Sequence, residues 1–380
     1  VRTIEIHSPD VINGKVEGVF DITEVPALVE NAVGSLYANY RPNKITTNQY
    51  LTFDFDIYNK IVEVFYPEIT LAPNTFIRGS VESDESEFRL AFRSPQINAF
   101  NNLFEQVNIQ VDNSNPLFNT FIEIDSVATG FYNVKDFNLI NVTLNDTLFI
   151  RSEFKGGPVS DDEFNLNLYH TINENNNSVV GLQRSDIKFK ESVWFLNEES
   201  DKSNRVIFSD GFKDIRVDSL VLSHENEEIR LTGEMRDTSY KDFKMEFEEV
   251  DLYKITPEIN SLSMHGIVNG SLNLLQQNNA YYPNTSLTIR ELAINDQLLG
   301  NLNLDVMGNR DLSLYNVNTT LRNEGLESLS AIGEILVENE TPTIDLEVNL
   351  RKFNLAAFSP LGKDVINNIR GLVSGDADVT

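Results

Sequence analysis

The stretch TPTIDLEVNLRKFNLAAFSPLGKDVINNIRGLVSGDADVT (residues 341–380) decides how the rest of the chain is interpreted. Its first part places an apolar side chain at every second position, and these are Ile344, Leu346, Val348 and Leu350. Strict alternation predicts a β-strand with one apolar and one polar face. A turn over residues 353–360, a helix-like piece over 364–369 and a second strand from Gly371 follow. Because that strand would leave an open sheet edge where the chain stops, we expect the chain to be a piece of a longer protein.

The same arrangement occurs earlier, over residues 243–274, which read FKMEFEEVDLYKITPEINSLSMHGIVNGSLNL. The turn that begins at Val250 has the apolar spacing of the turn that begins at Phe353, with an offset of 353 − 250 = 103 residues. The strands that follow share a Gly-x-Val-x-Gly pattern, at Gly266 and Gly270 in one copy and at Gly371 and Gly375 in the other. Residues 14–18 repeat this pattern in a weaker form. Since glycine within a strand often marks a bulge, we expect these glycines to bend the chain at each repeat rather than to contact a ligand.

Elsewhere the sequence is dominated by strand patterns. From Tyr50 onward, strand-like segments recur about every 10 to 14 residues, which is typical of an antiparallel meander. Residues 24–40 form the one convincing helix, and residues 61–66 are predicted as a strand. Strands that alternate with helices would indicate a parallel sheet, and the sequence does not show such an alternation. The predicted fold class is therefore mostly β, an elongated antiparallel sheet that its own twist curls into a groove, with a few short helices.

Two weak breaks suggest how the chain is divided. One is the Gly-Gly-Pro stretch at residues 155–158, and the other is the polar stretch at residues 276–279. We expect an N-terminal part over residues 1–157 and a repeat-bearing part over residues 158–380, with units near 243–274 and 344–380. No low-complexity linker separates these parts, so they are expected to form one continuous domain.

Composition excludes several classes of function. The chain has 380 residues, a formal net charge of −28 and no cysteine. This acidity opposes binding to nucleic acid and to anionic membrane surfaces. Without cysteine there are no disulfides, thiolate nucleophiles or sulfur-based zinc sites. A hydrophobic fraction of 41% is ample for a core, so we do not expect a disordered chain.

The residues that carry catalysis in other proteins form no recognisable motif here. The histidines His7, His170, His224 and His265 are scattered without metal-ligand spacing. No nucleophile elbow or phosphate-binding glycine loop occurs. Most carboxylates occupy alternate strand positions, as expected of a solvated face, although residues 112–115 and 376–378 leave weak calcium binding open. The prediction is a protein that is not an enzyme, with no catalytic residues, no metal and no cofactor.

The repeats instead predict a continuous apolar surface. A single unit cannot bury its apolar face, so successive units must pair edge to edge. The predicted groove-lining residues are Phe243, Met245, Phe247, Leu302, Leu304, Val306, Ile344, Leu346, Val348 and Leu350. The alternative is that these residues fill the core of a closed β-sandwich.

The repeated strand, turn, short helix and Gly-x-Val-x-Gly strand resembles the AsmA-like superfamily and, within it, the TamB family of bridge-like lipid-transfer proteins. Residues 112–126 (DNSNPLFNTFIEIDS) and 137–148 (FNLINVTLNDTL) look like the Bacteroidota branch of that family. The similarity of pattern extends over nearly all of the chain. Because the family's C-terminal domain is not recognisable, the resemblance implies a central fragment.

The resemblance implies a periplasmic β-groove that bridges the inner and outer membranes of a Gram-negative bacterium, anchored in the inner membrane by an N-terminal helix outside this chain. It implies phospholipid as cargo and an outer-membrane β-barrel assembly protein of the TamA or BamA type as partner. The expected function is phospholipid transfer, support of outer-membrane protein assembly, or both. The alternative is a chaperone-like scaffold that binds outer-membrane strands by strand addition without transporting lipid. A carbohydrate-binding or adhesin sandwich is disfavoured because the chain has a single tryptophan.

Overall fold

The computed structural model describes residues 1–8, 10–36, 41–84, 87–115, 117–130, 132–157, 161–209, 211, 213–237, 239–256, 263–277, 280–295, 297–337, 343–354, 356 and 371–379. Over these residues the chain forms 25 strands and three helices. The strands pair antiparallel in every ladder, which confirms the predicted fold class of a mostly β, antiparallel sheet.

The chain divides into two compact units, Val1–Val193 and Trp194–Thr380, called here the first unit and the second unit. The division expected at residue 157 lies inside the first unit instead. There β10 (Thr147–Gly156) and β11 (Asp162–Ile172) pair along their whole length, from Thr147 opposite Thr171 to Gly156 opposite Asp162. A Gly-Gly-Pro stretch therefore joins two neighbouring strands and separates no domains.

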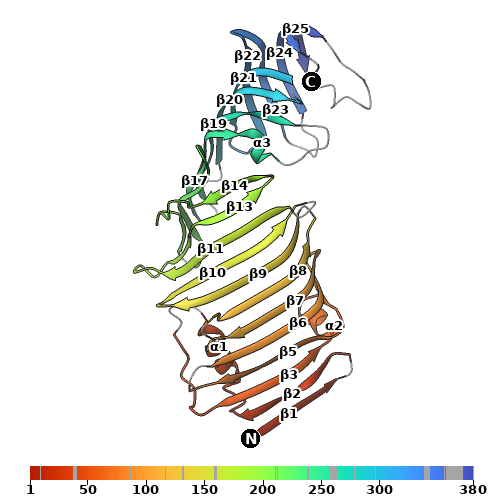
Figure 1. The fold of residues 1–380 in the computed structure, drawn as a ribbon, viewed down its shortest axis with the longest axis vertical. Helices are drawn as coiled ribbons and strands as arrows, with labels where there is room; N and C mark the ends of the chain where they lie inside the picture. Colours follow the sequence, from red (N-terminus) through yellow and green to blue (C-terminus); the bar gives the residue numbers. More distant parts are fainter. Residues whose placement is uncertain are drawn as a thin grey trace. The chain divides into compact units, whose positions relative to one another are not determined.

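The first unit is an antiparallel meander, and Figure 1 shows its middle strands side by side in chain order. Its other strands are β1 (Arg2–Ser8), β2 (Ile12–Val19), β3 (Tyr50–Ile57), β4 (Ile69–Leu71), β5 (Thr75–Glu82), β6 (Phe88–Ala99), β7 (Asn102–Asp112), β8 (Thr120–Ala128), β9 (Asn133–Leu144), β12 (Ser178–Leu182) and β13 (Ser185–Phe189). A two-residue hairpin turn at residues 145–146 joins β9 to β10, and both of its residues have positive φ, as such a tight turn requires.

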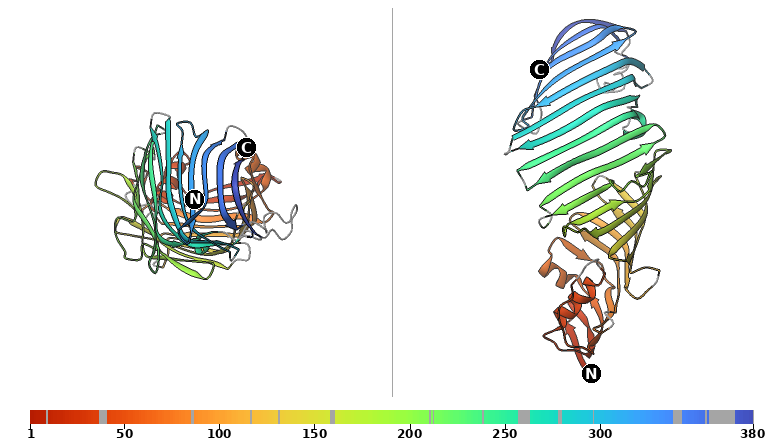
Figure 2. Two further views of the ribbon diagram at one scale, coloured as in Figure 1. Left: turned by 90° about the horizontal axis from the view of Figure 1, so that it is seen from above. Right: turned by 90° about the vertical axis from the view of Figure 1, so that its left-hand side faces the viewer.

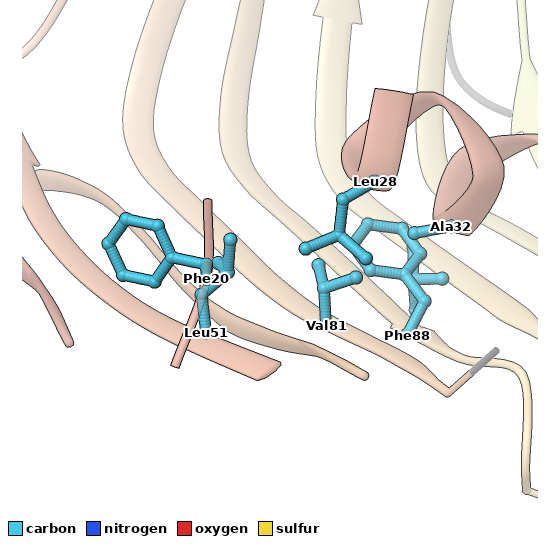
Figure 3. Close-up of a cluster of buried hydrophobic side chains, with 7 residues drawn as sticks. Phe20, Leu28, Ala32, Leu51, Val81 and Phe88 are labelled. Carbon is cyan, nitrogen blue, oxygen red and sulfur yellow. The ribbon is translucent and has the colours of Figure 1, made fainter. Parts of the chain in front are cut away.

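A helix covers part of one face of the first unit. Helix α1 (Val25–Gly34) lies within the predicted span 24–40, and Pro26 sits in its first turn, where its missing N–H costs nothing. The helix turns Leu28 and Ala32, one turn apart, onto Val81 and Phe88 of the sheet (Figure 3). Leu28 is 1% exposed, so this cluster is a hydrophobic core of the first unit. Residues 37–40 lie outside the described part of the chain.

The strand predicted at residues 61–66 is wrong. Residues Asn59–Phe65 form helix α2, and the side chain of Asn59 bonds that of Glu63 one turn later. Short apolar runs without alternation do not distinguish a strand from a helix, and here the local side-chain bond and Pro67 after the last turn fit a short helix. Val64 and Phe65 are 75% and 70% exposed on it.

The second unit is also antiparallel: β14 and β15 both pair with β16, and from β16 onward the strands form a meander in chain order. Its strands are β14 (Ser192–Leu196), β15 (Arg205–Ser209), β16 (Asp214–His224), β17 (Glu227–Arg236), β18 (Tyr240–Asp251), β19 (Met264–Gln277), β20 (Ala280–Ile294), β21 (Gln297–Gly308), β22 (Leu314–Asn323), β23 (Leu326–Leu336), β24 (Thr343–Asn354) and β25 (Leu372–Val379). The short helix α3 (Leu252–Ile255) follows β18 and packs against β19. Figure 2 shows that the strands of this unit bend along their length instead of lying flat.

The sequence repeat has the same backbone geometry in both copies. Each first strand carries a bulge, at Glu249 (φ 52°) in β18 and at Lys352 (φ 49°) in β24, where the register with the next strand shifts. In each bulge the backbone N–H donates a hydrogen bond to a side chain of the next strand. Glu249 donates to Asn269 Oδ1 at 3.0 Å, and Lys352 donates to Ser374 Oγ at 2.8 Å. The bulges lie 352 − 249 = 103 residues apart, which is the offset found in the sequence.

The repeated glycines accompany these bulges. Gly270 (φ 126°) lies opposite Phe247, and Gly375 (φ 155°) lies opposite Leu350, in each case just before the bulge. Gly266 and Gly371 also have positive φ, at 139° and 126°. Residues 14–18 lie in β2, which pairs with β1 and β3 without a register shift, so this third copy has no bulge. The helix-like piece at residues 364–369 lies outside the described residues.

Candidate functional site

The ten predicted lining residues lie on one face of the second unit. Residues directly opposite each other in a ladder point to the same side of the sheet, so the register identifies the face. One register row runs Phe247, Gly270, Leu287, Leu304, Thr319, Ala331, Val348. The next row runs Met245, Leu272, Thr285, Val306, Val317, Gly333, Leu346. Phe243, Leu302, Ile344 and Leu350 share this side, which is called here the apolar face of the second unit.

Burial differs between the two faces of this sheet. Leu302, Leu304 and Val306 are half-buried, while Asn303 and Asp305 between them are exposed. Ile344, at the start of β24, is 36% exposed, the most accessible of the predicted lining residues. The described strands from β16 to β25 are joined edge to edge in chain order, so none of them forms a second layer over this face. Within the described residues, the closed-sandwich alternative has no second sheet.

One border of the apolar face is a packed core. The bulge turns Phe353 inward, where it is 4% exposed and meets Leu292, Leu299 and Leu321. Leu252 of α3 packs against the same cluster, together with Leu302 and Leu350. Asp251 caps α3 by accepting a hydrogen bond from the N–H of Tyr253 at 3.0 Å. The bulges and α3 thus form a packed border at one end of the apolar face. The register rows through Leu304 and Val306 lie outside this packed cluster.

The first unit has an apolar face of its own, which the sequence analysis did not single out. Its clearest register row runs Phe55, Ile77, Phe92, Ile109, Ile122, Leu139, Ser152, Leu166. The signal was present in the sequence, because Phe53 and Phe55 alternate with Thr52 and Asp54. This side is called here the apolar face of the first unit. Its aromatic end includes Phe154 and Phe164, stacked with ring centroids 4.4 Å apart.

The opposite faces carry the charges. Arg78 bonds Asp54 at 2.8 Å and Lys188 bonds Glu163 at 3.2 Å, in both cases across neighbouring strands. These pairs are about half exposed, so each is worth at most about 1 kcal/mol. They keep one side of the first unit's sheet hydrated and leave its other side apolar. In the second unit, Lys244 and Glu246 form an ion pair on the side of β18 opposite Met245.

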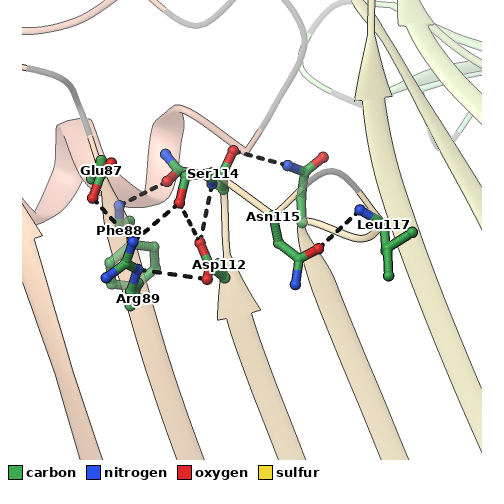
Figure 4. A network of polar contacts seen from close by, with 9 residues as sticks. Glu87, Phe88, Arg89, Asp112, Ser114, Asn115 and Leu117 are labelled. Carbon is green, nitrogen blue, oxygen red and sulfur yellow. Dashed lines mark hydrogen bonds and ion pairs between the residues drawn. The ribbon is translucent and has the colours of Figure 1, made fainter.

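In the turn at residues 112–115, which the sequence left open as a calcium site, the Asp112 carboxylate contacts side chains and backbone of the protein itself. Asp112 Oδ1 accepts from the N–H and the hydroxyl of Ser114, at 3.1 and 2.7 Å, and Arg89 lies 3.5 Å from Oδ2 (Figure 4). Asn113 accepts from the N–H of Phe88 at 2.8 Å and thereby joins this turn to β6. In the part of the chain that the structure describes, no three acidic or histidine side chains group as metal ligands would.

Two titratable groups of the first unit have shifted pKa values. Burial, reinforced by a hydrogen bond to Asp162 at 2.9 Å, raises the pKa of the Tyr132 hydroxyl far above its usual range. Burial lowers the pKa of His170, whose Nε2 lies 2.7 Å from Ser178 Oγ. Tyr132 lies against Gly156, where any added side chain would collide with its ring. This geometry indicates that the Tyr132–Asp162 bond ties the start of β9 to the start of β11 across Gly156 at the end of β10.

Comparison with known proteins adds no relative: no family model, no curated protein and no solved structure matches this chain. Among the described helices, none is long and apolar enough to cross a membrane. The fold and the two faces define an antiparallel β protein whose units each present one apolar and one charged side.

Proposed function

We propose that the chain carries lipid acyl chains along the apolar faces of its two units. The observation that supports this proposal is the register of the second unit, which aligns mostly apolar residues in rows across strands β18 to β24, each row holding a single threonine, Thr319 or Thr285. A row of this length suits a long flexible chain better than it suits a compact ligand.

The energetics of this mechanism require no catalytic residue. Each CH₂ group of an acyl chain that leaves water for an apolar surface contributes about 0.8 kcal/mol. Most strands offer an apolar residue in this row, such as Leu287, Leu304 and Val348, so an acyl chain meets apolar surroundings at most steps. Similar affinity at each step allows a chain to slide without a deep trap, while its polar head stays in water.

The resemblance of the repeat to the TamB family supplies the setting of the proposal. In that setting the protein lies in the periplasm and passes phospholipid between the inner and outer membranes, in contact with an outer-membrane barrel assembly protein. The net charge of −28 fits this role, because an acidic exterior does not bind the anionic surfaces on either side.

The test is mass spectrometry of lipids that co-purify with the chain. We expect phospholipid with the wild-type chain and little with Leu304→Asp or Leu346→Asp, because a carboxylate on the apolar face must stay hydrated. Ile332→Asp is the matched control: Ile332 is 56% exposed and lies opposite Asn318 and Glu347 on the other face. It should keep its lipid.

Three results would speak against lipid carriage. One is a wild-type chain free of lipid, and another is equal lipid on all three aspartate variants. The third is binding of unfolded outer-membrane strands that survives the apolar-face substitutions, which would favour the scaffold alternative.

A further inference from the structure

Two neighbouring polar side chains on the apolar face of the first unit carry a buried atom without a hydrogen-bond partner among the described residues. Asn141 lies in β9 and Ser152 lies in β10. The carbonyl Oδ1 of Asn141 and the hydroxyl Oγ of Ser152 are both buried, and within the described part of the chain neither has a hydrogen-bond partner. Ser152 as a whole is 7% exposed. A buried polar group without a partner is costly, so its retention in an apolar surface calls for a reason.

The two groups are neighbours on the same side of the sheet. Asn141 lies opposite Ile150, and Ser152 lies opposite Leu139, so the two positions are diagonal across the β9–β10 ladder. Diagonal neighbours in such a ladder are about 7 Å apart at Cβ or slightly closer. Both side chains extend from the same face, so one small polar group between them is within reach of both.

The chemistry of the two atoms defines what fits. The Oδ1 of Asn141 only accepts a hydrogen bond, whereas the Ser152 hydroxyl can donate one. A hydroxyl group complements this pair, because it donates to Asn141 and accepts from Ser152. An ester carbonyl satisfies only Ser152, and a hydrocarbon satisfies neither.

We propose that Asn141 and Ser152 form a subsite for a hydroxyl group carried on an acyl chain that lies along the apolar face of the first unit. This inference rests on the proposed function, since it needs an acyl chain on that face. The surrounding Leu139, Leu166 and Leu168 are half-buried and supply the apolar walls. Leu139 and Leu166 lie directly opposite Ser152 in the two ladders of β10, and Leu168 lies opposite Ile150, the partner of Asn141.

The experiment compares stearate with 12-hydroxystearate, which differ by one hydroxyl group, in competition against a fluorescent fatty acid on the full chain. We expect the wild type to bind 12-hydroxystearate about tenfold more tightly, as two good hydrogen bonds provide. The Asn141→Leu/Ser152→Ala double variant should lose this preference and keep its affinity for stearate. Its melting temperature should stay the same or rise, because two unsatisfied buried groups are gone.

The outcomes separate this inference from the proposed function. Equal binding of the two acids by the wild type, or a preference that the double variant retains, overturns the subsite while acyl binding stands. Failure of both acids to bind overturns the proposed function as well. A lower melting temperature with an unchanged preference assigns the two residues to structure alone and also overturns the subsite. If the double variant does not fold, Ser152→Ala alone, which removes one oxygen, should reduce the preference about threefold.

Discussion

The two units organise one apolar face each, and they hold it in different ways. In the first unit a helix packs on the sheet, and the core lies where Leu28 meets Val81 and Phe88. In the second unit, one end of the apolar face is closed by the strand bulges at Glu249 and Lys352 and by the four-residue helix α3. Both units have a packed core, but a helix supplies part of it in the first unit, whereas a backbone bulge precedes the core residue Phe353 in the second.

The largest effect should come from disturbing that backbone geometry. In Gly270→Ala the added methyl group would lie 2.1 Å from the carbonyl oxygen of Ser286, at a φ of 126° that alanine disfavours. We expect a loss of about 3 to 5 kcal/mol in the stability of the second unit. The probe is urea unfolding followed by the fluorescence of Trp194, the only tryptophan, which is 2% exposed in the second unit.

Gly375→Ala is the matched control from the other copy of the repeat. Its φ is 155°, but no atom of the described residues lies within 4 Å of the added methyl group, so we expect a loss of about 1 kcal/mol. Equal losses for the two variants would show that the close approach at Gly270 does not matter.

The next largest effect should come from the core of the first unit. Leu28→Ala removes a fully buried side chain, so we expect a loss of about 3 kcal/mol that hydrogen exchange locates in the first unit. The midpoint of the urea unfolding transition followed by Trp194 fluorescence should not change. Val29→Ala, on the exposed side of the same helix at 38%, should cost less than about 1 kcal/mol. A shifted Trp194 transition in Leu28→Ala would mean that the two units unfold together.

The smallest effect is a dependence on pH confined to the first unit. Because burial lowers the pKa of His170 from 6.5, the unfolded chain binds the proton more readily than the folded chain. Stability should therefore be constant above the ordinary histidine pKa and fall as the pH drops through it. His170→Gln should remove this slope, and His7→Gln, on an exposed strand, should not. Unfolding of the first unit measured by hydrogen exchange between pH 5 and pH 8 provides the test.

Glu24, a carboxylate of the first unit, affects stability over a lower pH range than His170 does. Hydrogen bonds, chiefly from the backbone N–H of Thr46, lower the pKa of Glu24 below its ordinary value of 4.5. That contribution is present above the ordinary carboxylate pKa and is lost only as the pH falls further. A slope that persists in His170→Gln between pH 5 and pH 7 would contradict the assignment to His170.

The sequence predicted the strands and their faces because alternation is a local property. The hairpin turns at residues 145–146 and 225–226 were predictable for the same reason, since polar turn residues flank alternating runs. The repeat offset of 103 residues anticipated the paired bulges at Glu249 and Lys352. Their positive φ was not predictable, because neither residue type favours it; the side-chain acceptors Asn269 and Ser374 on the next strand stabilise it.

Other features depend on contacts between distant residues and left no local pattern. Nothing near residue 157 in the sequence shows that β10 and β11 pair across it. The apolar run at residues 61–66 fits a strand as well as the helix that it forms. The polar pair of Asn141 and Ser152 becomes visible only when the register brings two separate strands together.

The most direct test of lipid carriage is photocrosslinking from both sides of both sheets. Benzoylphenylalanine replaces Leu304 and Leu166 on the apolar faces, and Ile332 and Arg151 on the opposite faces. After illumination with phospholipid vesicles, mass spectrometry counts the lipid adducts at each position. Lipid carriage along the apolar faces predicts adducts at Leu304 and Leu166 and few at Ile332 and Arg151. Equal labelling at all four positions, or labelling of the opposite faces alone, would contradict it.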